Sequence, residues 1–469
     1  MSEMLEKARK YEDEQGKQIK AEDRPVFHVS PYVGWMNDPN GLCEFQGVNH
    51  IYFQYTPFLA GWGTKLWGHY TTKDWIHYKE EEPFLYPDEE WDRDGVYSGS
   101  AYTCEDGIHY FYTGNVKLWD KDYDYIMNGR EQNTIHVFSP DGKNIAYKKL
   151  VMTNDDYPVN MSKHVRDPKI YKKDGRYYMI QGGRDAESYG CALLFCSDDL
   201  EHWKWYDTVR TAKPFGYMWE CPNFVHIGGE DVLMISPQGI KPHGKMFLNK
   251  YQSGWFVGKL DYNTGKFKQK GPFGLFDHGF DFYAPQVMKT PDGRSVIIGW
   301  LDMWDTKMPE KADQWAGMMS IPRELKVVNG KVITTPVTEL KSMRYDKVSY
   351  TNQAFNGEKA FNNVRGDVYE LETEIDMTKA QSLCIKLRFS PSQETVLSYD
   401  KNSKILKLNR DKSGQALTGE REVTLPLTDN LLKLRIFSDK SSLEVFANDG
   451  QAVMSSRIYP DKNATGIKF

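Results

Sequence analysis

Residues 35–55, Trp-Met-Asn-Asp-Pro-Asn-Gly-Leu-Cys-Glu-Phe-Gln-Gly-Val-Asn-His-Ile-Tyr-Phe-Gln-Tyr, contain the unit on which the fold prediction rests. A polar segment at 38–41 is followed by a second turn at Gly47 and by a strand-like run at 50–55. Pro presets one backbone angle and Asn-Gly tolerates positive φ, so the segment at 38–41 alone predicts an ordinary tight turn. A functional role for Asp38 requires that other carboxylates recur in the same setting.

The unit repeats along the chain. A turn that contains glycine precedes a strand-like run five times, at Gly47, Gly107, Gly175, Gly229 and Gly293, with 54–68 residues between successive glycines. Repeats of this length, made of short strands and regular turns, are typical of four-stranded propeller blades. The sequence therefore predicts a five-bladed β-propeller; the alternative is a large irregular sandwich whose hairpins resemble one another.

The two ends of the chain differ from the repeats. Residues 1–20 carry a weak apolar stripe at helical spacing and predict a short N-terminal helix. From residue 350 onward, six or seven short strands, one hairpin turn at 448–450 among them, predict a separate β-sandwich. We expect an all-β protein with a helical extension at 1–24, a five-bladed propeller at 25–340 and a C-terminal β-sandwich at 350–469.

Composition narrows the class of protein. The 469 residues carry a net charge of −5, so no overall positive field attracts nucleic acid. The N-terminus lacks an apolar signal-peptide core, and no run approaches the length of a membrane helix. The six cysteines are scattered without a Cys-x-x-Cys pair, which predicts free, buried thiols in a reducing compartment. We expect a cytoplasmic protein with no membrane or nucleic-acid partner.

Three acidic residues hold nearly the same place in three repeats. Asp38 and Glu220 lie nine residues before the glycine of their repeat, and Asp167 lies eight before its own. Ser98 and Tyr283 hold the place in the second and fifth repeats, at nine and ten residues. Equivalent positions of successive blades form a ring about the propeller axis, so we expect these side chains to converge at one mouth of the channel.

The residue types indicate the chemistry. No His or Cys stands at metal-ligand spacing beside the carboxylates, so we expect no metal site there. Two carboxyl groups acting as a pair are typical of glycoside hydrolysis, and a third can support positive charge on the sugar ring. Each acid taken singly is better explained as a turn carboxylate or a solvated strand end, and only the common position of the three favours a functional role. A non-catalytic sugar-binding propeller and an inverting five-bladed hydrolase of arabinans are alternatives, but the first does not need three acids and the motifs beside the acids do not match the second.

Ordered motifs across nearly the whole chain resemble glycoside hydrolase family 32, which contains invertases, sucrose-6-phosphate hydrolases and fructan hydrolases. The strongest are Trp-Met-Asn-Asp-Pro-Asn-Gly at 35–41, Arg-Asp-Pro at 166–168 and Glu-Cys-Pro at 220–222. Supporting motifs stand at 67–69, 97–100, 236–239, 281–286, 321–325 and 442–450. The family fold, a five-bladed propeller followed by a β-sandwich, agrees with the repeat count.

The resemblance implies a role for each site residue. Asp38 is expected to be the nucleophile that forms a covalent fructosyl-enzyme, Glu220 the acid/base and Asp167 the transition-state stabiliser. Further positions match family residues that line the fructose pocket or support the acid/base: Asn37, Gln54, Trp62, Ser98, Arg166, Cys221, Tyr283 and Trp300. The implied activity is that of a retaining β-fructofuranosidase of the sucrose-6-phosphate hydrolase type, without a cofactor.

Two departures from the family pattern concern the leaving group of the substrate. Tyr97 stands where the family usually has Phe, and Tyr-Thr-Thr at 70–72 replaces a small residue and Ser. Sucrose 6-phosphate is the first candidate substrate, and sucrose and short fructo-oligosaccharides are its rivals; fructosyl transfer would use the same residues. Lys241, His243 and Lys245 could bind a phosphate or form a solvated loop. For the sandwich we expect a structural or dimerising role, in a monomer or homodimer.

Overall fold

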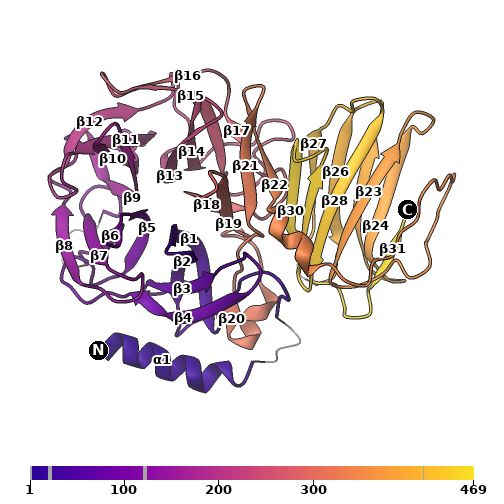
Figure 1. The fold of residues 1–469 in the computed structure, drawn as a ribbon, viewed down its shortest axis with the longest axis horizontal. Coiled ribbons are helices and arrows are strands. Elements are labelled where there is room, and N and C mark those ends of the chain that lie inside the picture. Colours follow the sequence, from indigo (N-terminus) through magenta and orange to yellow (C-terminus); the bar gives the residue numbers. More distant parts are fainter. Residues whose placement is uncertain (1–2, 20–23, 120–123, 416) are drawn as a thin grey trace.

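The computed structural model describes residues 3–19, 24–119, 124–415 and 417–469. Five antiparallel sheets surround a common centre, and a two-sheet sandwich lies beside them (Figure 1). The predicted fold class, a five-bladed propeller followed by a β-sandwich, is confirmed. No helix in the described ranges has both the length and the apolar content needed to cross a bilayer.

Each blade consists of four strands in sequence order from the centre outward, apart from a small crossover in the last blade. Blade I contains β1 (Gly34–Phe45), β2 (Val48–Thr56), β3 (Leu66–Thr72) and β4 (Tyr78–Leu85). Blade II contains β5 (Val96–Thr103), β6 (Ile108–Lys117), β7 (Arg130–Ser139) and β8 (Tyr147–Met152). Blade III contains β9 (Met161–Lys173), β10 (Arg176–Asp185), β11 (Gly190–Ser197) and β12 (Lys204–Val209). Blade IV contains β13 (Met218–Ile227), β14 (Glu230–Gln238), β15 (Gly254–Asp261) and β16 (Lys266–Gln269), and the short β17 (Gly274–Leu275) also pairs with β15. Blade V contains β18 (Tyr283–Lys289), β19 (Ser295–Trp300), β21 (Arg323–Val328) and β22 (Lys331–Pro336).

The glycine turns of the sequence repeat are the hairpins between the first two strands of each blade. Gly47, Gly175, Gly229 and Gly293 all have φ between 78° and 86°, a conformation that favours glycine. The ring is completed by β20 (Trp315–Ala316), which pairs in parallel with Gly34 and Trp35 at the start of β1. The first and last parts of the propeller are therefore joined by backbone hydrogen bonds as well as by packing.

The N-terminal helix α1 (Glu3–Gly16) lies against β4 of blade I (Figure 1). Leu5 and Ala8 face the propeller and are buried, in line with the predicted apolar stripe. The buried Glu12 accepts hydrogen bonds from the Tyr55 hydroxyl (2.9 Å) and from Arg9 (2.9 Å). These contacts fix the helix on the outside of blade I.

The C-terminal sandwich has more strands than predicted. One sheet contains β23 (Tyr369–Asp376), β28 (Leu431–Asp439), β29 (Ser442–Ala447) and β30 (Ala452–Arg457), and the other contains β27 (Glu420–Thr424), β26 (Ile405–Lys412), β25 (Glu394–Asp400), β24 (Ser382–Phe389) and β31 (Gly466–Lys468). The two unpredicted strands, β27 and β31, lie at the edges of the second sheet, where charged or very short strands carry little pattern. The expectation that all thiols are buried is wrong for Cys384, which is exposed on β24, and for the half-buried Cys104.

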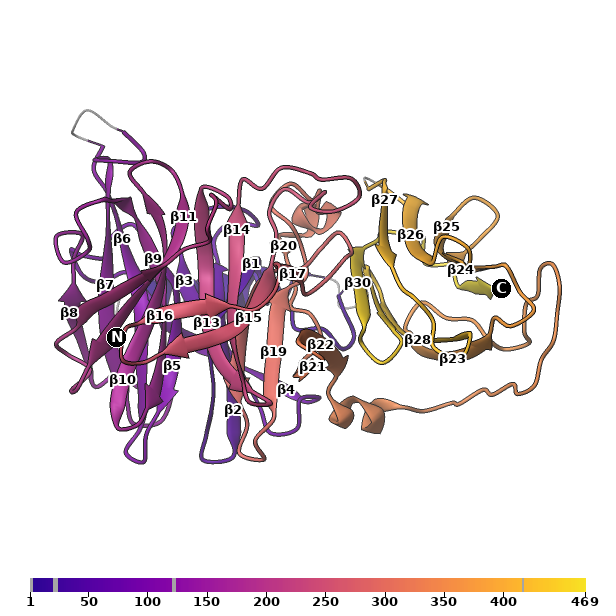
Figure 2. The same ribbon diagram turned by 90° about the horizontal axis from the view of Figure 1, so that it is seen from above.

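Buried ion pairs join the sandwich to the propeller. Glu444 on β29 accepts hydrogen bonds from His28 (2.8 Å) and from the Arg323 Nε (3.1 Å) of blade V. The other imidazole nitrogen of His28 lies 2.9 Å from Asp439, and Arg323 also pairs with Asp277 at 3.1 Å. From η3 (Thr338–Met343) the chain runs along the sandwich before it enters β23 (Figure 2). We propose that the domain boundary falls in this connection, at residues 340–350.

Candidate active site

The innermost strands of the five blades contact one another in a ring, β1 to β5, β9, β13, β18 and back to β1 (Figure 1). Each of these strands contains a β-bulge at which two of its residues lie opposite one residue of the next strand. The bulged pairs are Asn37-Asp38, Tyr97-Ser98, Asp167-Pro168, Cys221-Pro222 and Ala284-Pro285. A bulge bends the strand and redirects its side chains, and this irregularity recurs in all five strands that carry the residues predicted to form a ring at the channel mouth.

The three carboxylates share the bulge but not one position in it. Asp38 is the second residue of its bulged pair, Asp167 is the first, and Glu220 directly precedes the pair. Counting back from the glycine turns placed them at nearly equal phase, but the strand pairing separates them by up to two residues. Asp167 and Cys221 have positive φ, 63° and 46°, which is costly for residues with a Cβ and is typical of functional sites.

The half-buried Asp38 is surrounded by hydrogen-bond donors. Its Oδ1 accepts from the Asn37 amide at 3.0 Å, and its Oδ2 accepts from the Ser98 hydroxyl at 2.8 Å. The Cys221 thiol approaches the same Oδ2 at 3.6 Å. Burial and the nearby charge of Glu220 raise the pKa of Asp38, whereas the two hydrogen bonds oppose the shift. The carboxylate is held in one orientation by blades I, II and IV.

Asp167 is joined to the strand that carries Glu220. Its Oδ2 accepts a hydrogen bond from the Cys221 backbone N–H at 2.8 Å, and its own N–H donates to the Thr113 hydroxyl at 2.9 Å. Burial raises the pKa of Asp167 to about 7; the Arg166 guanidinium opposes this shift and the Glu220 charge adds to it. Asp167 is therefore held in place by contacts with both neighbouring blades, II and IV.

Glu220 has donors on both carboxylate oxygens. Oε1 accepts from the Arg166 guanidinium at 2.7 Å, and Oε2 accepts from the Gln238 amide at 2.7 Å and from the Tyr283 hydroxyl. Blades III, IV and V therefore all contribute to its position. The structure brings together Asp38, Asp167, Glu220 and five of the predicted supporting residues: Asn37, Ser98, Arg166, Cys221 and Tyr283.

The other predicted pocket residues lie around this centre. Trp62 is 53% exposed and forms edge contacts with Tyr97 and Trp304, as expected of an aromatic residue at a rim. Gln54 lies opposite the bulge of β1 and donates to the Val96 carbonyl at 2.9 Å. Trp300 is fully buried, and its ring centroid lies 5.7 Å from that of Trp35. Trp300 thus supports the site from behind, whereas Gln54 lies level with the bulge that carries Asp38.

Comparison with known proteins agrees with this arrangement. The family model for the N-terminal domain of glycosyl hydrolases family 32 matches residues 28–336, and the model for the C-terminal domain matches 339–469. The chain belongs to this family. The family 32 chain is 38% identical to a sucrose-6-phosphate hydrolase of Escherichia coli (93% of this chain, 89% of the relative) and 35% identical to that of Staphylococcus xylosus (96% and 90%). A solved β-fructofuranosidase of Bombyx mori in complex with sucrose superposes with a TM-score of 0.87 at 29% identity, covering 100% of this chain and 96% of that one.

Two contacts of this family 32 site were not predicted from the sequence. Gln238 belongs to the motif at 236–239, but the sequence did not predict that its amide donates to Glu220. Lys65 is fully buried and donates to Thr56 at 3.1 Å, with its ammonium 4.7 Å from the Trp62 ring centroid. Burial lowers the pKa of Lys65 to about 7, and the Asp38 charge opposes the shift. The sequence around Lys65 does not predict that its side chain is buried. The only signal nearby is the family motif at 67–69.

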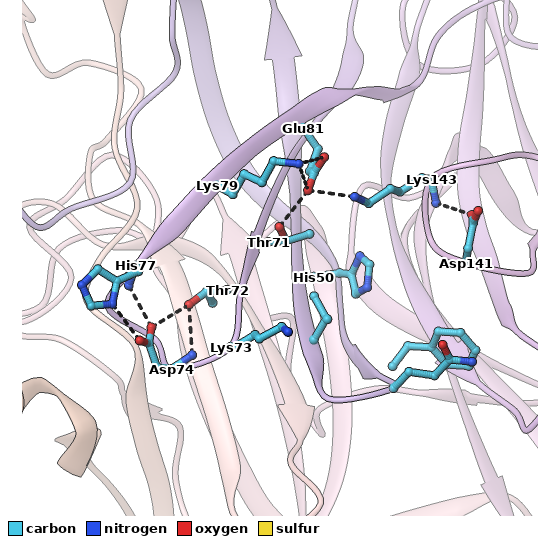
Figure 3. A pocket seen from close by; sticks show the side chains of 13 residues that line it. His50, Thr71, Thr72, Lys73, Asp74, His77, Lys79, Glu81, Asp141 and Lys143 are labelled. Atoms are coloured by element: carbon cyan, nitrogen blue, oxygen red, sulfur yellow. Dashed lines mark hydrogen bonds and ion pairs between the residues drawn. The ribbon is translucent and has the colours of Figure 1, made fainter.

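A separate hollow of about 570 Å³ lies at the opposite end of blade I, where Figure 3 shows Lys79 and Lys143 directed at Glu81. Glu81 accepts hydrogen bonds from Thr71 at 3.0 Å and from Lys143 at 2.9 Å, so the Glu81 carboxylate is already paired with a cation. Cys104, Asp106 and His109 have potential metal-ligand atoms within 4.8 Å of one another, but they lie at the far end of blade II from Ser98. Neither group reaches the three carboxylates.

Proposed function

We propose that this family 32 enzyme is a retaining β-fructofuranosidase that releases the terminal fructosyl unit of sucrose or sucrose 6-phosphate. The observation that supports it most directly is the placement of Asp38, Asp167 and Glu220 at the bulges of three of the five inner strands, β1, β9 and β13. Cys221 contacts two of these carboxylates, with its N–H on Asp167 and its thiol near Asp38. Three carboxyl groups so placed can surround one sugar ring.

In the first step, Asp38 attacks the anomeric carbon of the fructosyl unit. The bond from that carbon to the glycosidic oxygen breaks, and Glu220 gives a proton to the departing oxygen. The hydrogen bonds from Asn37 and Ser98 hold the Asp38 oxygens in position, which lowers the entropy lost on reaching the transition state. The products of this step are the free leaving sugar and a fructosyl ester of Asp38.

In the second step, water cleaves the ester. Glu220 now takes a proton from the water molecule, and the water oxygen attacks the anomeric carbon from the face that the leaving sugar vacated. Asp38 departs as a carboxylate, so two inversions give net retention. In both steps Asp167 binds the fructosyl hydroxyls and its charge stabilises the oxocarbenium-like transition state.

The pocket residues divide between the two sugars. Asn37, Gln54, Ser98 and Arg166 belong with the fructosyl unit, whereas the exposed Trp62 provides a stacking surface at the rim. The relatives of Escherichia coli and Staphylococcus xylosus are named sucrose-6-phosphate hydrolases, and the Bombyx mori structure holds sucrose. These names support a sucrose-type substrate. Hydrolysis of fructo-oligosaccharides and fructosyl transfer use the same residues, but the relatives' names do not favour them.

Replacement of the nucleophile tests the mechanism. We expect Asp38→Asn to lower kcat on sucrose by at least about 1,000-fold with an unchanged thermal midpoint, because the amide cannot form the ester. Glu44→Gln is a matched control, since Glu44 lies on the same strand β1 at its far end and only caps the turn at Gly47. Turnover by Asp38→Asn at a rate near that of the Glu44→Gln control would exclude Asp38 as the nucleophile.

The stereochemical outcome tests retention independently. In water containing methanol, a retaining enzyme gives methyl β-D-fructofuranoside as the first methyl glycoside, which proton NMR distinguishes from the α anomer. Analysis of products at high sucrose would also reveal any transfer to a second sugar. We further propose a cytoplasmic enzyme that acts as a monomer or homodimer, which cell fractionation and sedimentation would check.

A further inference from the structure

We propose that Arg130 and Arg184 bind the phosphate group of a phosphorylated leaving sugar, which makes sucrose 6-phosphate the preferred substrate. The inference rests on the proposed β-fructofuranosidase activity and concerns the side of the site that holds the leaving group. Arg130 begins β7 and Arg184 stands one residue before the end of β10. These strand ends lie on the face of the propeller that carries the bulges, because β9 begins on that face and runs antiparallel to β10.

Short contacts connect Arg130 to the acid/base. The Arg130 guanidinium lies 4.1 Å from the centroid of the Tyr125 ring, and the Tyr125 carbonyl accepts a hydrogen bond from His164 Nε2 at 3.0 Å. His164 Nδ1 then accepts from Arg166 at 2.9 Å, and Arg166 holds Glu220. Arg130 is thus separated from Glu220 by one aromatic ring, one imidazole and one guanidinium.

Arg184 approaches the acid/base from the opposite side, along blade IV. Its guanidinium lies 4.9 Å from the Tyr217 ring centroid. The Tyr217 hydroxyl donates to that of Tyr251 at 3.4 Å, and the Tyr251 ring lies 5.8 Å from the ring of Tyr283, which donates to Glu220. Because Glu220 protonates the oxygen of the leaving sugar, groups that flank it on the open face lie where that sugar binds.

Neither arginine has a carboxylate partner within the described parts of the chain. Arg130 is only 3% exposed, and its Nε is buried with no hydrogen-bond acceptor among the described residues. Arg184 donates to one hydroxyl, that of Ser188, at 2.8 Å. The equally buried Arg323 and Arg457 each pair with two carboxylates. A buried cation without a counter-charge is costly, and an anionic ligand would remove that cost.

The surroundings of His164 are positively charged, because His164 interacts electrostatically with both arginines. Burial together with the Arg166, Arg130 and Arg184 cations lowers its pKa to about 2, so it stays neutral. The nearest acidic side chain of β10, Asp185, is already paired with Arg210. A phosphate carries nearly two negative charges and accepts two parallel hydrogen bonds from each guanidinium, so its chemistry matches this cluster.

The loop first considered for phosphate binding is a weaker candidate. Lys245 lies 3.5 Å from Glu422 and 3.8 Å from Glu420 of the sandwich, so two carboxylates already offset its charge. His243 and Met246 form a small turn through two backbone hydrogen bonds. Among the described residues, by contrast, Arg130 and Arg184 have no acidic partner, and a chain of side-chain contacts connects each of them to the acid/base.

Kinetics with two substrates test the proposal. For wild type, Arg130→Gln and Arg184→Gln we would measure kcat/KM on sucrose 6-phosphate and on sucrose, and compare the ratio of the two values. Loss of a charged hydrogen-bond pair to phosphate lowers that ratio about 10- to 100-fold in each variant. Arg176→Gln is the matched control, because Arg176 stands at the other end of β10 and pairs with the exposed Asp198 at 3.1 Å. The control leaves the ratio unchanged.

Product inhibition supplies a second readout. Glucose 6-phosphate inhibits wild type more strongly than glucose does, and each Gln variant loses this difference. An unchanged substrate ratio with unchanged inhibition would overturn the proposal. If Arg130→Gln does not fold, the same measurements on the variant of the half-buried Arg184 test the proposal. Arg130→Lys is a second variant, which keeps the positive charge but cannot donate two parallel hydrogen bonds. Wild type that cleaves sucrose without favouring the phosphate ester refutes this inference alone, whereas wild type that cleaves neither substrate refutes the proposed function.

Discussion

Glu444→Gln tests whether the two domains are held together by buried charge. Glu444 is fully buried on β29 of the sandwich and accepts hydrogen bonds from three donors of the propeller side. These are the His28 imidazole at 2.8 Å, the Ile321 N–H at 2.9 Å and the Arg323 guanidinium, whose Nε lies at 3.1 Å. Glutamine has nearly the same shape, but it leaves two buried cations with only one carboxylate each, Asp439 and Asp277.

Removing one partner from a buried ion pair costs about 3–5 kcal/mol, and we expect a loss of this size for Glu444→Gln. The matched control is Glu372→Gln on β23, because Glu372 is an exposed partner of Arg344. Exposed pairs contribute about 0–1 kcal/mol. Urea unfolding followed by tryptophan fluorescence measures both variants, and hydrogen exchange locates the loss at residues 26–33 and 319–325. A loss for Glu444→Gln no larger than that for Glu372→Gln would refute the assignment.

The pH dependence of the loss gives a further check. The hydrogen bonds to Asp439 and Glu444 outweigh burial and raise the pKa of His28 to about 9, so its contribution to stability is complete below about 6.5 and disappears as pH rises through about 9. The pKa of Glu444 is lowered, so its contribution is present above the ordinary glutamate pKa and disappears as pH falls. The difference between wild type and Glu444→Gln is therefore largest between about pH 5 and 8 and shrinks on both sides.

Three further predictions concern the active site. Lys65→Met removes a cation that lowers the pKa of Asp38, so we expect the acid limb of the pH profile of kcat/KM on sucrose to move to higher pH; an unmoved limb would separate Lys65 from the nucleophile. Tyr283→Phe removes one hydrogen bond to Glu220 and should lower kcat about 10- to 100-fold with little change in thermal midpoint, and a full-rate variant would contradict this role. Trp62→Ala should raise KM for sucrose about 2- to 10-fold and leave kcat nearly constant, since stacking at the rim contributes only to binding; a fall in kcat alone would argue against that.

The sequence was sufficient for the blades because their hairpins depend on local chemistry. A glycine with positive φ, such as Gly47 or Gly175, marks each turn between the first two strands of a blade whatever the rest of the fold does. The closure of the ring was not predictable, because β20 is only two residues long and pairs with residues far away in the sequence. The domain interface was missed for the same reason: Glu444 and Arg323 stand in motifs, but their pairing is 121 residues apart in the chain.

The positions of the acids show a finer limit of sequence reasoning. Distance from a glycine turn indicates which strand a residue belongs to, but one additional residue in a strand changes which face its side chain occupies. The bulges therefore decide that Asp38, Asp167 and Glu220 point into one space although they occupy three different positions. The hydrogen bond from Gln238 to Glu220 was not predicted, because it depends on the pairing of Gln238 with Met218 beside the bulge of β13.

The bulges also explain why neighbouring blades act as one site. The positive φ of Asp167 and Cys221 costs about 1–3 kcal/mol for each residue, and it is maintained by contacts between blades rather than within one. The Cys221 N–H that the strained backbone exposes donates to Asp167 of blade III, while the Asp167 N–H donates to Thr113 of blade II. Each strained residue thus directs a backbone donor at the preceding blade. Separate blades could not hold these conformations, so the closed ring of inner strands is a requirement of the chemistry as well as of the fold.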